Sequence, residues 1–382
     1  MSLPFSRQSG VALIAALLLM TSIVFILGNI FYRHQINVAQ STLSIHQDQA
    51  YLLALSAESW ARQLLEEDLA DSSADHFGEL WAQAIPAMPV DGGMVNGCIS
   101  DLQGRFNLNN FRVSYKTPEA LNSELSGDES SYAKVWNSLL LYFEIPIFPG
   151  RVEAIVDWLD DDSSKIGPEG AEEEDYAGQI PPQMIADSVM VEPSELASVV
   201  GYEIFEVQRL MPWITALPVA ASTPSSVEET TRINVNTASE ELLLALSGDL
   251  DSQFRDAVLA NRPFDDLQVF YNSLAYDFSL PVADIQRRWP DTLIGVSSNF
   301  FQLYIEVMLG EARIEVKSII MRSSNADSVI ISRELTTVPA SVDKNSASEL
   351  LEKLLANSES DKESEKIIDE QQVMPACLMI GA

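Results

Sequence analysis

The hydrophobic pattern changes several times along the chain, and the first feature is an apolar run near the N-terminus. Residues 11–31 carry no charged side chain and are mostly apolar. A helix of that length spans roughly 30 Å, the thickness of a bilayer's hydrocarbon core, so we predict a transmembrane helix. Arg7 precedes the run and acidic residues dominate after it. The positive-inside rule therefore predicts a cytoplasmic N-terminus, with the bulk of the chain outside.

The helical pattern does not stop where the apolar run ends. Up to about Leu69, apolar residues recur at steps of three and four, and neither Pro nor Gly interrupts the stretch. We therefore predict one long N-terminal helix, half in lipid and half in a globular head. The alternative is a membrane anchor followed by a coiled coil. It is disfavoured because the apolar stripe keeps no strict heptad.

The start of the apolar run resembles the processing site of type IV prepilins. Gly10 directly precedes Val11. At such a site the prepilin peptidase cuts on the cytoplasmic side, before the apolar segment, and the helix stays on the mature protein. A signal anchor and a cleaved secretory signal peptide are the alternatives. The signal peptide is disfavoured because the run is too long and no Ala-x-Ala site closes it.

One departure from the prepilin pattern carries information about position in a fibre. Most prepilins have Glu at the fifth mature position, where this chain has Ala15. A membrane-embedded Glu is costly unless it is paired, and in pilins its partner is the terminal amine of a subunit already in the fibre. A subunit that enters first has no such partner. The absence of Glu therefore favours a subunit at the tip.

The middle of the chain reads as short helices joined by loops, with a repeated string. Arg105-Phe-Asn-Leu-Asn109 matches Arg232-Ile-Asn-Val-Asn236. We interpret this as the duplication of a small helical module, and a coincidental match is the alternative. Asn107, Asn109, Asn234 and Asn236 are expected to cap helices or to satisfy backbone groups at strand-to-helix corners. Predicted helices cover 132–143, 151–159, 193–200, 202–211, 240–246, 252–261, 267–274 and 284–289.

Strands are predicted mainly near the end of the chain. From Val296 the apolar period becomes two, which predicts strands at 301–309, 314–320 and 328–335 with a turn at Gly310. They form an antiparallel meander with one solvated face. Residues 86–104 read as loops with one short strand at 96–101. Beyond Thr337 the composition predicts a disordered acidic tail with a short helix at 350–355.

Composition excludes several classes of function. Against 23 Lys and Arg stand 56 Asp and Glu, a net charge of −33, so no basic footprint for nucleic acid exists. The chain contains no Gly-x-Ser-x-Gly, P-loop or His-Glu-x-x-His motif, which argues against an enzyme. Two cysteines rule out a Cys-rich zinc scaffold. A disulfide between Cys98 and Cys377 is left open.

The most chemically distinctive segment is the acidic stretch 157–176. It holds nine carboxylates and one basic residue, Lys165. Carboxylates this dense repel one another unless they are solvated or bound to a cation. Calcium, which takes six to eight oxygen ligands in flexible geometry, suits such a loop, although no EF-hand pattern is present. A solvated acidic loop is the alternative.

Taken together, the chain closely resembles the general secretion pathway protein K family, the large minor pseudopilins of type II secretion systems. The resemblance implies a pilin-like head interrupted by a helical insertion. It also implies assembly with minor pseudopilins I, J and H at the tip of an inner-membrane pseudopilus, and Ala15 is a trait of the family. The matching stretches are Gly10-Val-Ala-Leu-Ile14, Ala54-Leu-Ser-Ala-Glu-Ser-Trp-Ala61, Asp101-Leu-Gln-Gly-Arg-Phe-Asn-Leu-Asn-Asn110, Asp157-Trp-Leu-Asp160, Gly170-Ala-Glu-Glu173, Ile233-Asn-Val-Asn-Thr-Ala238, Asn261-Arg-Pro-Phe264 and Leu309-Gly-Glu-Ala-Arg313.

The resemblance assigns roles to particular residues. It implies cleavage between Gly10 and Val11 by the prepilin peptidase and N-methylation of Val11. It favours structural calcium, with ligands expected among Asp160, Asp162, Glu172, Glu173 and Asp175, the first four of which fall on the family's acidic motif. The bulk of the protein is expected in the periplasm, where it helps start pseudopilus assembly for the export of folded proteins across the outer membrane.

The expected fold class is α+β: a long N-terminal helix on an antiparallel sheet, with a large all-helical insertion that contains two similar modules. A rival function is that of a membrane-anchored helix-hairpin-helix DNA-binding protein of a competence-type system, because residues 233–239 resemble the start of such a module. It is disfavoured because acidic residues occupy the hairpin at 246–251. The expected divisions are a leader (1–10), a transmembrane segment (11–31), the first part of the head (32–111), the insertion (112–290), the C-terminal sheet (291–338) and the tail (339–382).

Overall fold

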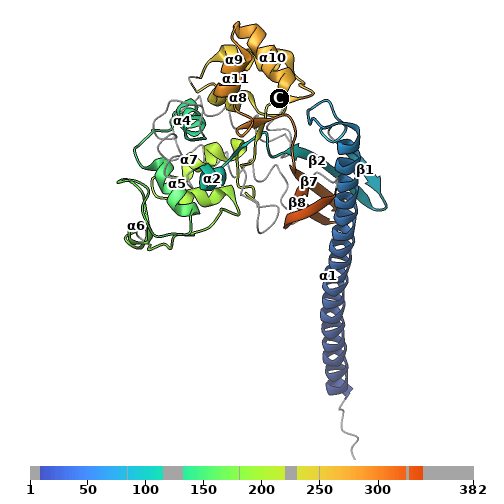
Figure 1. Cartoon of the computed structure of the whole chain (residues 1–382). Helices are drawn as coiled ribbons and strands as arrows, with labels where there is room; N and C mark the ends of the chain where they lie inside the picture. The colour runs from blue at the N-terminus through green and yellow to red at the C-terminus, as the bar shows by residue number, and fades with distance from the viewer. Residues whose placement is uncertain are drawn as a thin grey trace, which may run out of the picture.

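A computed structural model shows one long helix that leads into a two-part head (Figure 1). It describes residues 9–83, 85–114, 132–179, 181–219, 230–248, 250–323 and 327–338. The first eight residues of the leader lie outside the described residues. So do the expected acidic tail, its predicted helix at 350–355, and Cys377. The head consists of an antiparallel sheet beside helix α1 and a lobe of short helices.

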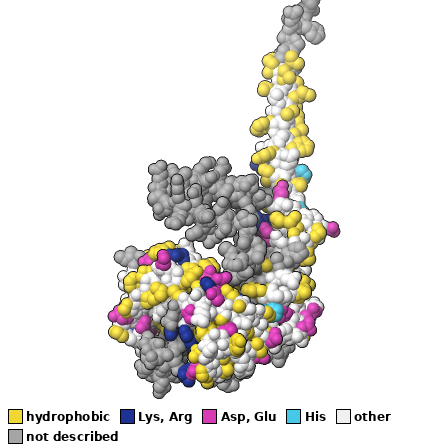
Figure 2. All heavy atoms as spheres, turned by 90° about the horizontal axis from the view of Figure 1, so that it is seen from above, with side chains coloured by type: hydrophobic (Ala, Val, Ile, Leu, Met, Phe, Trp, Pro, Cys, Tyr) yellow, Lys and Arg dark blue, Asp and Glu magenta, His cyan; other side chains and the backbone are white. Residues whose placement is uncertain are grey.

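Helix α1 (Ser9–Asp71) runs without interruption, which confirms the prediction of a single long N-terminal helix. Its apolar part is long enough to cross a membrane. Figure 2 shows hydrophobic side chains all along the part that projects from the head. From Ala50 onward one side of the helix packs on the sheet, because Ala54, Ala61 and Leu65 follow at helical spacing and are buried. The small side chains of Ala50, Ala54 and Ala61 let the strands approach the helix closely.

A buried carboxylate fixes α1 to the sheet at a defined position. Glu58 lies on the same side of the helix as the buried alanines and is 4% exposed. Ser318 donates its hydroxyl to Glu58 at 2.5 Å, and Arg333 donates its Nε at 3.0 Å. Buried carboxylates need such partners, because an unpaired charge in the interior is expensive. The helix therefore cannot slide along the sheet without breaking these bonds.

The sheet has five antiparallel strands in the order β1-β2-β7-β8-β9. The predicted C-terminal meander is confirmed. The prediction of loop at 86–95 is wrong, because edge strand β1 and the start of β2 occupy it. Two prolines in β1 made the sequence read as a loop. An edge strand tolerates proline because one side of its backbone forms no hydrogen bonds to a neighbouring strand. The strands are β1 (Ile85–Val90), β2 (Gly93–Asp101), β7 (Phe300–Leu309), β8 (Ala312–Arg322) and β9 (Ser328–Val338).

The helical lobe is inserted between two strands that are neighbours in the sheet. Strand β2 pairs with β7 over its whole length, although the lobe separates them in the sequence. Phe106, Leu108 and Phe111 already belong to the lobe's own core, so the expected boundary at 112 falls inside the lobe. The helices are α2 (Asn110–Ser114), α4 (Tyr132–Tyr142), α5 (Arg151–Leu159), α6 (Glu173–Ala177), η1 (Pro193–Ser198), α7 (Ile204–Leu210), η2 (Met211–Trp213), α8 (Glu240–Leu246), α9 (Ser252–Asn261), α10 (Leu267–Phe278) and α11 (Val282–Arg288).

The two asparagine strings form equivalent structures. Short strand β3 (Phe106–Asn107) pairs in parallel with β4 (Ile214–Thr215), and β5 (Ile233–Asn234) pairs in parallel with β6 (Ile294–Gly295). The second asparagine of each string then binds both backbone groups of one distant residue. Asn109 does so with Met190, and Asn236 with Phe264, with bond lengths of 2.9–3.0 Å.

The first asparagine of each string closes a local turn. Asn107 Oδ1 accepts the N–H of Asn109, and Asn234 Oδ1 accepts the N–H of Asn236. These asparagines thus satisfy backbone groups, whereas the helix that follows the second string is capped by Ser239. The matching bonds at both places support the interpretation of an internal duplication.

A second buried carboxylate joins the lobe to the sheet. Asp101 ends strand β2 and is 5% exposed. It accepts the backbone N–H of Gln103 at 2.8 Å and the side-chain amide of Asn234 at 3.0 Å. The hydroxyls of Thr237 and Ser298 each donate to it at 2.5 Å. Burial raises the pKa of Asp101, and these donors act in the opposite direction.

We predict that Asp101→Asn destabilises the protein by roughly 1–3 kcal/mol, because an amide has one accepting oxygen and leaves at least one buried donor unpaired. The melting temperature of the full chain in detergent measures this. Asp91→Asn is the matched control, because Asp91 is exposed in the turn between β1 and β2. Equal melting temperatures for the two variants would show that the Asp101 bonds do not hold the junction.

Candidate metal site

The predicted calcium loop connects helices α5 and α6 and is folded around an internal carboxylate. Asp157, in the last turn of α5, is completely buried. It accepts the N–H of Ile166 at 2.8 Å and the N–H of Ala171 at 2.7 Å. A β-carbon at Gly170 would lie 2.3 Å from Asp157 Oδ2, so only glycine fits there. Asp157 therefore shapes the loop with both of its oxygens.

Three of the five predicted ligands come together at the mouth of this loop. Asp160, Asp162 and Glu172 each place a carboxylate oxygen within 4.8 Å of the others. Asp160 Oδ1 and Glu172 Oε1 are buried and have no hydrogen-bond partner. Buried carboxylate oxygens normally find a donor or a cation, because leaving them unpaired costs free energy. The geometry therefore fits a hard cation with oxygen ligands, such as calcium.

The electrostatics of the three carboxylates agree with the geometry. Burial, followed by the charges of Asp162 and Asp157, raises the pKa of Asp160 to about 6. Burial, followed by Asp157 and Asp160, raises the pKa of Glu172 to about 7. These groups repel one another as anions, and a divalent cation among them would reverse that effect.

The remaining two predicted ligands lie outside the group. Asp175 forms an ion pair with Lys165 at 2.7 Å and accepts the N–H of Glu172 at 2.9 Å. The hydrogen bond from Lys165 lowers the pKa of Asp175, so this carboxylate already has its cation. Glu173 is the exposed first residue of α6. In the structure Asp175 positions Glu172, and Glu173 faces solvent.

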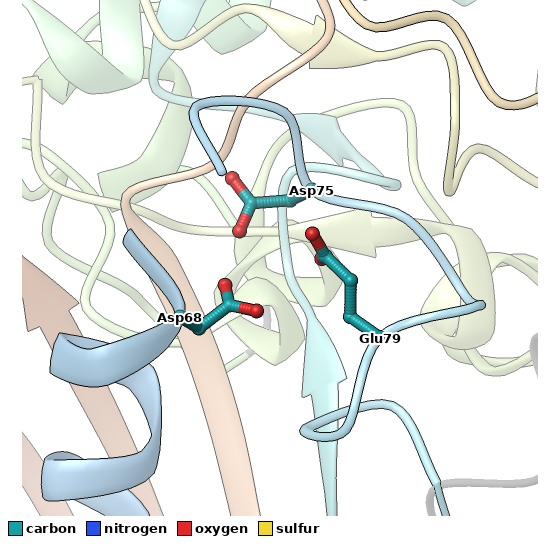
Figure 3. Close-up of side chains that lie close together, drawn as sticks. All are labelled: Asp68, Asp75 and Glu79. Atoms are coloured by element: carbon teal, nitrogen blue, oxygen red, sulfur yellow. The ribbon is translucent and has the colours of Figure 1, made fainter. Parts of the chain in front are cut away.

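A second group of acids, which sequence analysis did not single out, lies where α1 ends. Figure 3 shows Asp68, Asp75 and Glu79 converging from the helix and the turn that follows it. Arg322 is completely buried beside them, donates to Asp68 at 3.0 Å and pairs with Asp75. Glu79 accepts the indole N–H of Trp81 at 2.7 Å. These acids already have cationic or neutral donors, so we assign them a structural role.

The predicted processing site lies at the start of the helix. Ser9 and Gly10 form the first turn of α1. Val11 follows and is 72% exposed. Cleavage before Val11 and its methylation stay predictions, because the geometry of an uncleaved helix does not test them.

The structure gives no support to the DNA-binding alternative. A helix-hairpin-helix module needs free backbone amides and basic side chains at the turn that meets phosphate. In the turn between α8 and α9, Asp251 uses its carboxylate to cap α9 by accepting the N–H of Gln253 at 2.9 Å. The start of α9 is therefore already capped by a carboxylate of the chain itself.

Comparison with known proteins supports the resemblance seen in the sequence. Family models described as "Type II secretion system (T2SS), protein K" match residues 104–219 and 233–277, the two halves of the lobe. The chain is 29% identical to type II secretion system protein K of Aeromonas hydrophila, over 86% of this chain and 97% of the relative. It is 33% identical to that of Pectobacterium carotovorum, over 62% of this chain and 68% of the relative.

A solved structure has the same fold. It is the GspK-GspI-GspJ complex of the enterotoxigenic Escherichia coli type 2 secretion system, with a TM-score of 0.62 and 23% identity, over 76% of this chain and 96% of that chain. Sequence and architecture agree along most of the chain, and the protein belongs to the type II secretion system protein K family.

Proposed function

We propose that this minor pseudopilin caps the tip of the periplasmic pseudopilus and helps to start its assembly. Its proposed partners are proteins I, J and H of the same secretion system. The assembled pseudopilus would serve the export of folded proteins across the outer membrane. The observation that carries the proposal is the position of the lobe. Because the lobe is inserted in the chain between the paired strands β2 and β7, it is tied to the sheet at both of its ends. Figure 1 shows α8–α11 lying beyond the end of α1 that enters the head, where a further subunit would stack.

Helix α1 offers the docking surface for the subunits below the tip. Val38, Ile45 and Leu52 recur every seven residues and are 50%, 55% and 62% exposed. Seven residues are close to two helical turns, so the three side chains form one apolar line. Leu52 lies two residues from Ala54, roughly 200° around the helix, so this line faces away from the sheet. A partner's long helix fits such a line. The solved complex with GspI and GspJ supports proteins I and J as the source of that helix.

We predict that Leu52→Glu lowers the capture of proteins I and J by at least ~10-fold, because it places a charge in an apolar helix contact. Affinity purification of the tagged full chain from membranes measures this. Phe205→Glu, at a lobe position that is 59% exposed, is the control and should leave capture unchanged. If Phe205→Glu lowered capture and Leu52→Glu did not, the lobe would be the docking surface. The proposal that the lobe caps the tip would then fail.

The start of α1 supports processing by the prepilin peptidase. Removal of residues 1–10 would leave Val11 as the N-terminus of a helix that stays in the inner membrane. Its charge-free segment would anchor the protein, and the positive-inside rule supports a periplasmic head. N-methylation of Val11 would follow the cut, by analogy with the family.

We predict that mature protein from membranes begins with N-methylated Val11. Gly10→Leu should block the cut, because a long side chain replaces the glycine before the scissile bond, whereas Ser9→Ala should be processed normally. Mass spectrometry of the N-terminal peptide distinguishes the products. A mature chain that begins near residue 32 would instead indicate removal of an ordinary signal peptide.

Calcium is the cation that we propose for Asp160, Asp162 and Glu172. Their oxygens converge, two of these oxygens are buried without a partner, and no basic side chain among the described residues pairs with the three carboxylates. When bound, the ion would neutralise the mutual repulsion and tie the end of α5 to the start of α6. Asp157 and Asp175 would hold the loop in position through their hydrogen bonds to its backbone N–H groups.

We predict that calcium at a hundredfold excess over its dissociation constant raises the melting temperature by roughly 5 °C, since binding to the folded state alone is then worth about 2.7 kcal/mol. Glu172→Gln should abolish most of the shift. The adjacent Glu173→Gln is the matched control and should keep it, because Glu173 lies outside the group. Melting curves that coincide in chelator and in millimolar calcium would leave the loop as a solvated acidic surface.

A further inference from the structure

Helix α1 stays apolar on its sheet-facing side beyond the point where the sheet ends. Ala50 is the first helix residue in the buried core under the sheet. Leu43 lies seven residues before Ala50 and Ile36 lies seven before Leu43, so all three are on one side of the helix. Ala39, which is exposed, lies on the same side between Ile36 and Leu43. We call Ile36, Ala39 and Leu43 the sheet-side line.

The strands do not cover the sheet-side line. A β-carbon added to Gly310 would lie 2.5 Å from His46 Nδ1, so the turn between β7 and β8 touches α1 at His46. Ile36 and Leu43 precede that contact and are 38% and 36% exposed. Neither belongs to a buried core formed by the described residues. The line therefore presents apolar surface that gains stability when it is covered.

The apolar line of Val38, Ile45 and Leu52 lies on the other side of the helix, and we call it the back line. Its members follow positions 36, 43 and 50 by two residues each, which is roughly 200° around the helix. A helix packs against its neighbour through a stripe about 100° wide. One partner helix therefore cannot cover both lines.

Lipid does not reach the upper end of the sheet-side line. The charge-free segment ends at Phe31, and Leu43 follows it by twelve residues, roughly 18 Å along the helix. The headgroup layer on one side of a bilayer is about 5–8 Å thick. Leu43 would thus stand clear of the membrane, where another protein has to cover it.

The spacing and the charge of the sheet-side line fit a second helix. Ile36, Ala39 and Leu43 follow one another at steps of three and four residues, the spacing by which one helix packs along another. The small side chain of Ala39 allows a close approach. Residues 35–47 contain no Asp, Glu, Lys or Arg, so the surface offers no ion pair to a charged segment. An apolar helix is the partner of matching chemistry.

We propose that α1 is held between two partner helices, one on the back line and one on the sheet-side line, and that proteins I and J each supply one of them. The proposal rests on the proposed function of a tip subunit that starts assembly. The solved structure with the same fold is a complex that contains two further proteins, GspI and GspJ, which matches the number of lines. Because the lines face opposite directions, the two helices bind without competing. A subunit with both lines gathers two partners at once.

Photo-cross-linking of the full chain in membranes tests the arrangement, with tagged proteins I and J produced alongside it. A photoreactive amino acid replaces Leu43 or, separately, Ile45. One position should cross-link to protein I and the other to protein J. Ser44 is exposed and lies roughly 100° from each of these neighbours, so it is the matched control. The same amino acid at Ser44 should yield at least about fivefold less of either product.

The identity of the cross-linked product separates the possible occupants. Links from Leu43 and Ile45 to the same protein would show that one partner covers both sides, which overturns the proposal. Lipid adducts at Leu43, or links there to a second copy of this chain, would overturn it as well. If Ile45 links to protein I or J and Leu43 links to neither, the second helix fails while the proposed function stands. If neither position links to protein I or J, docking through α1 fails too.

A pair of substitutions tests whether the sheet-side line contributes to binding. Leu43→Glu should lower the recovery of the complex that contains both proteins I and J about tenfold, because it places a charge in an apolar helix contact. The adjacent Ser44→Glu is the control and should leave recovery unchanged. The melting temperature of the full chain alone, in detergent, should be the same for both variants, because Leu43 lies outside the core under the sheet. Equal recovery of the complex with the two variants would overturn the proposal.

Discussion

The position of the helical lobe depends on one buried carboxylate, that of Asp101. It stands at the point where the chain leaves the sheet, and it receives four donors from three separate segments. Asn234 comes from the second module of the lobe and Ser298 from the segment that returns to the sheet. Asn234 also donates to the backbone of Asp75. A lobe joined to a sheet by two strands could otherwise rotate about that joint. The shared acceptor removes that freedom, because each donor loses its partner if the lobe turns.

The same junction explains why the acids at the end of α1 and the buried Arg322 lie together. Asp75 pairs with Arg322 through one oxygen and accepts the N–H of Ser298 at 2.7 Å through the other. Arg322 in turn donates to the backbone of Ser298 at 2.9 Å and stacks over Phe301. Helix α1, strand β8 and the root of the lobe therefore meet in one hydrogen-bonded network. These contacts hold the long helix, the sheet and the root of the lobe in one arrangement.

Sequence alone predicted most of the elements, and the exceptions have physical reasons. Helices α5, α8 and α9 begin and end where expected, because the apolar period marks all three and side chains cap the start of α8 and α9. Helix α10 continues to Phe278, beyond the predicted end at 274. It ends where Ser279 takes the left-handed conformation, and the sequence has no glycine there to indicate that end. Strand β1 was missed because Pro86 and Pro89 mask an edge strand. In the acidic loop, spacing could not show that Asp175 is neutralised by Lys165, or that Asp157 accepts only backbone donors. The partners of these two carboxylates depend on the path of the folded loop, which residue types alone do not reveal.

The buried carboxylates described above are compensated in different ways. Comparing their partners distinguishes carboxylates that stabilise the fold from those that are candidates for binding a ligand. Asp68 and Asp75 share a buried arginine. Asp101 receives neutral donors on both of its oxygens. Asp160 and Glu172 have no basic partner among the described residues, and each keeps one buried oxygen without a donor. Among these described acids, internal donors compensate Asp68, Asp75 and Asp101. Of these three arrangements, the one between α5 and α6 is the one with buried carboxylate oxygens that lack a donor, and this difference supports the proposal of a cation there.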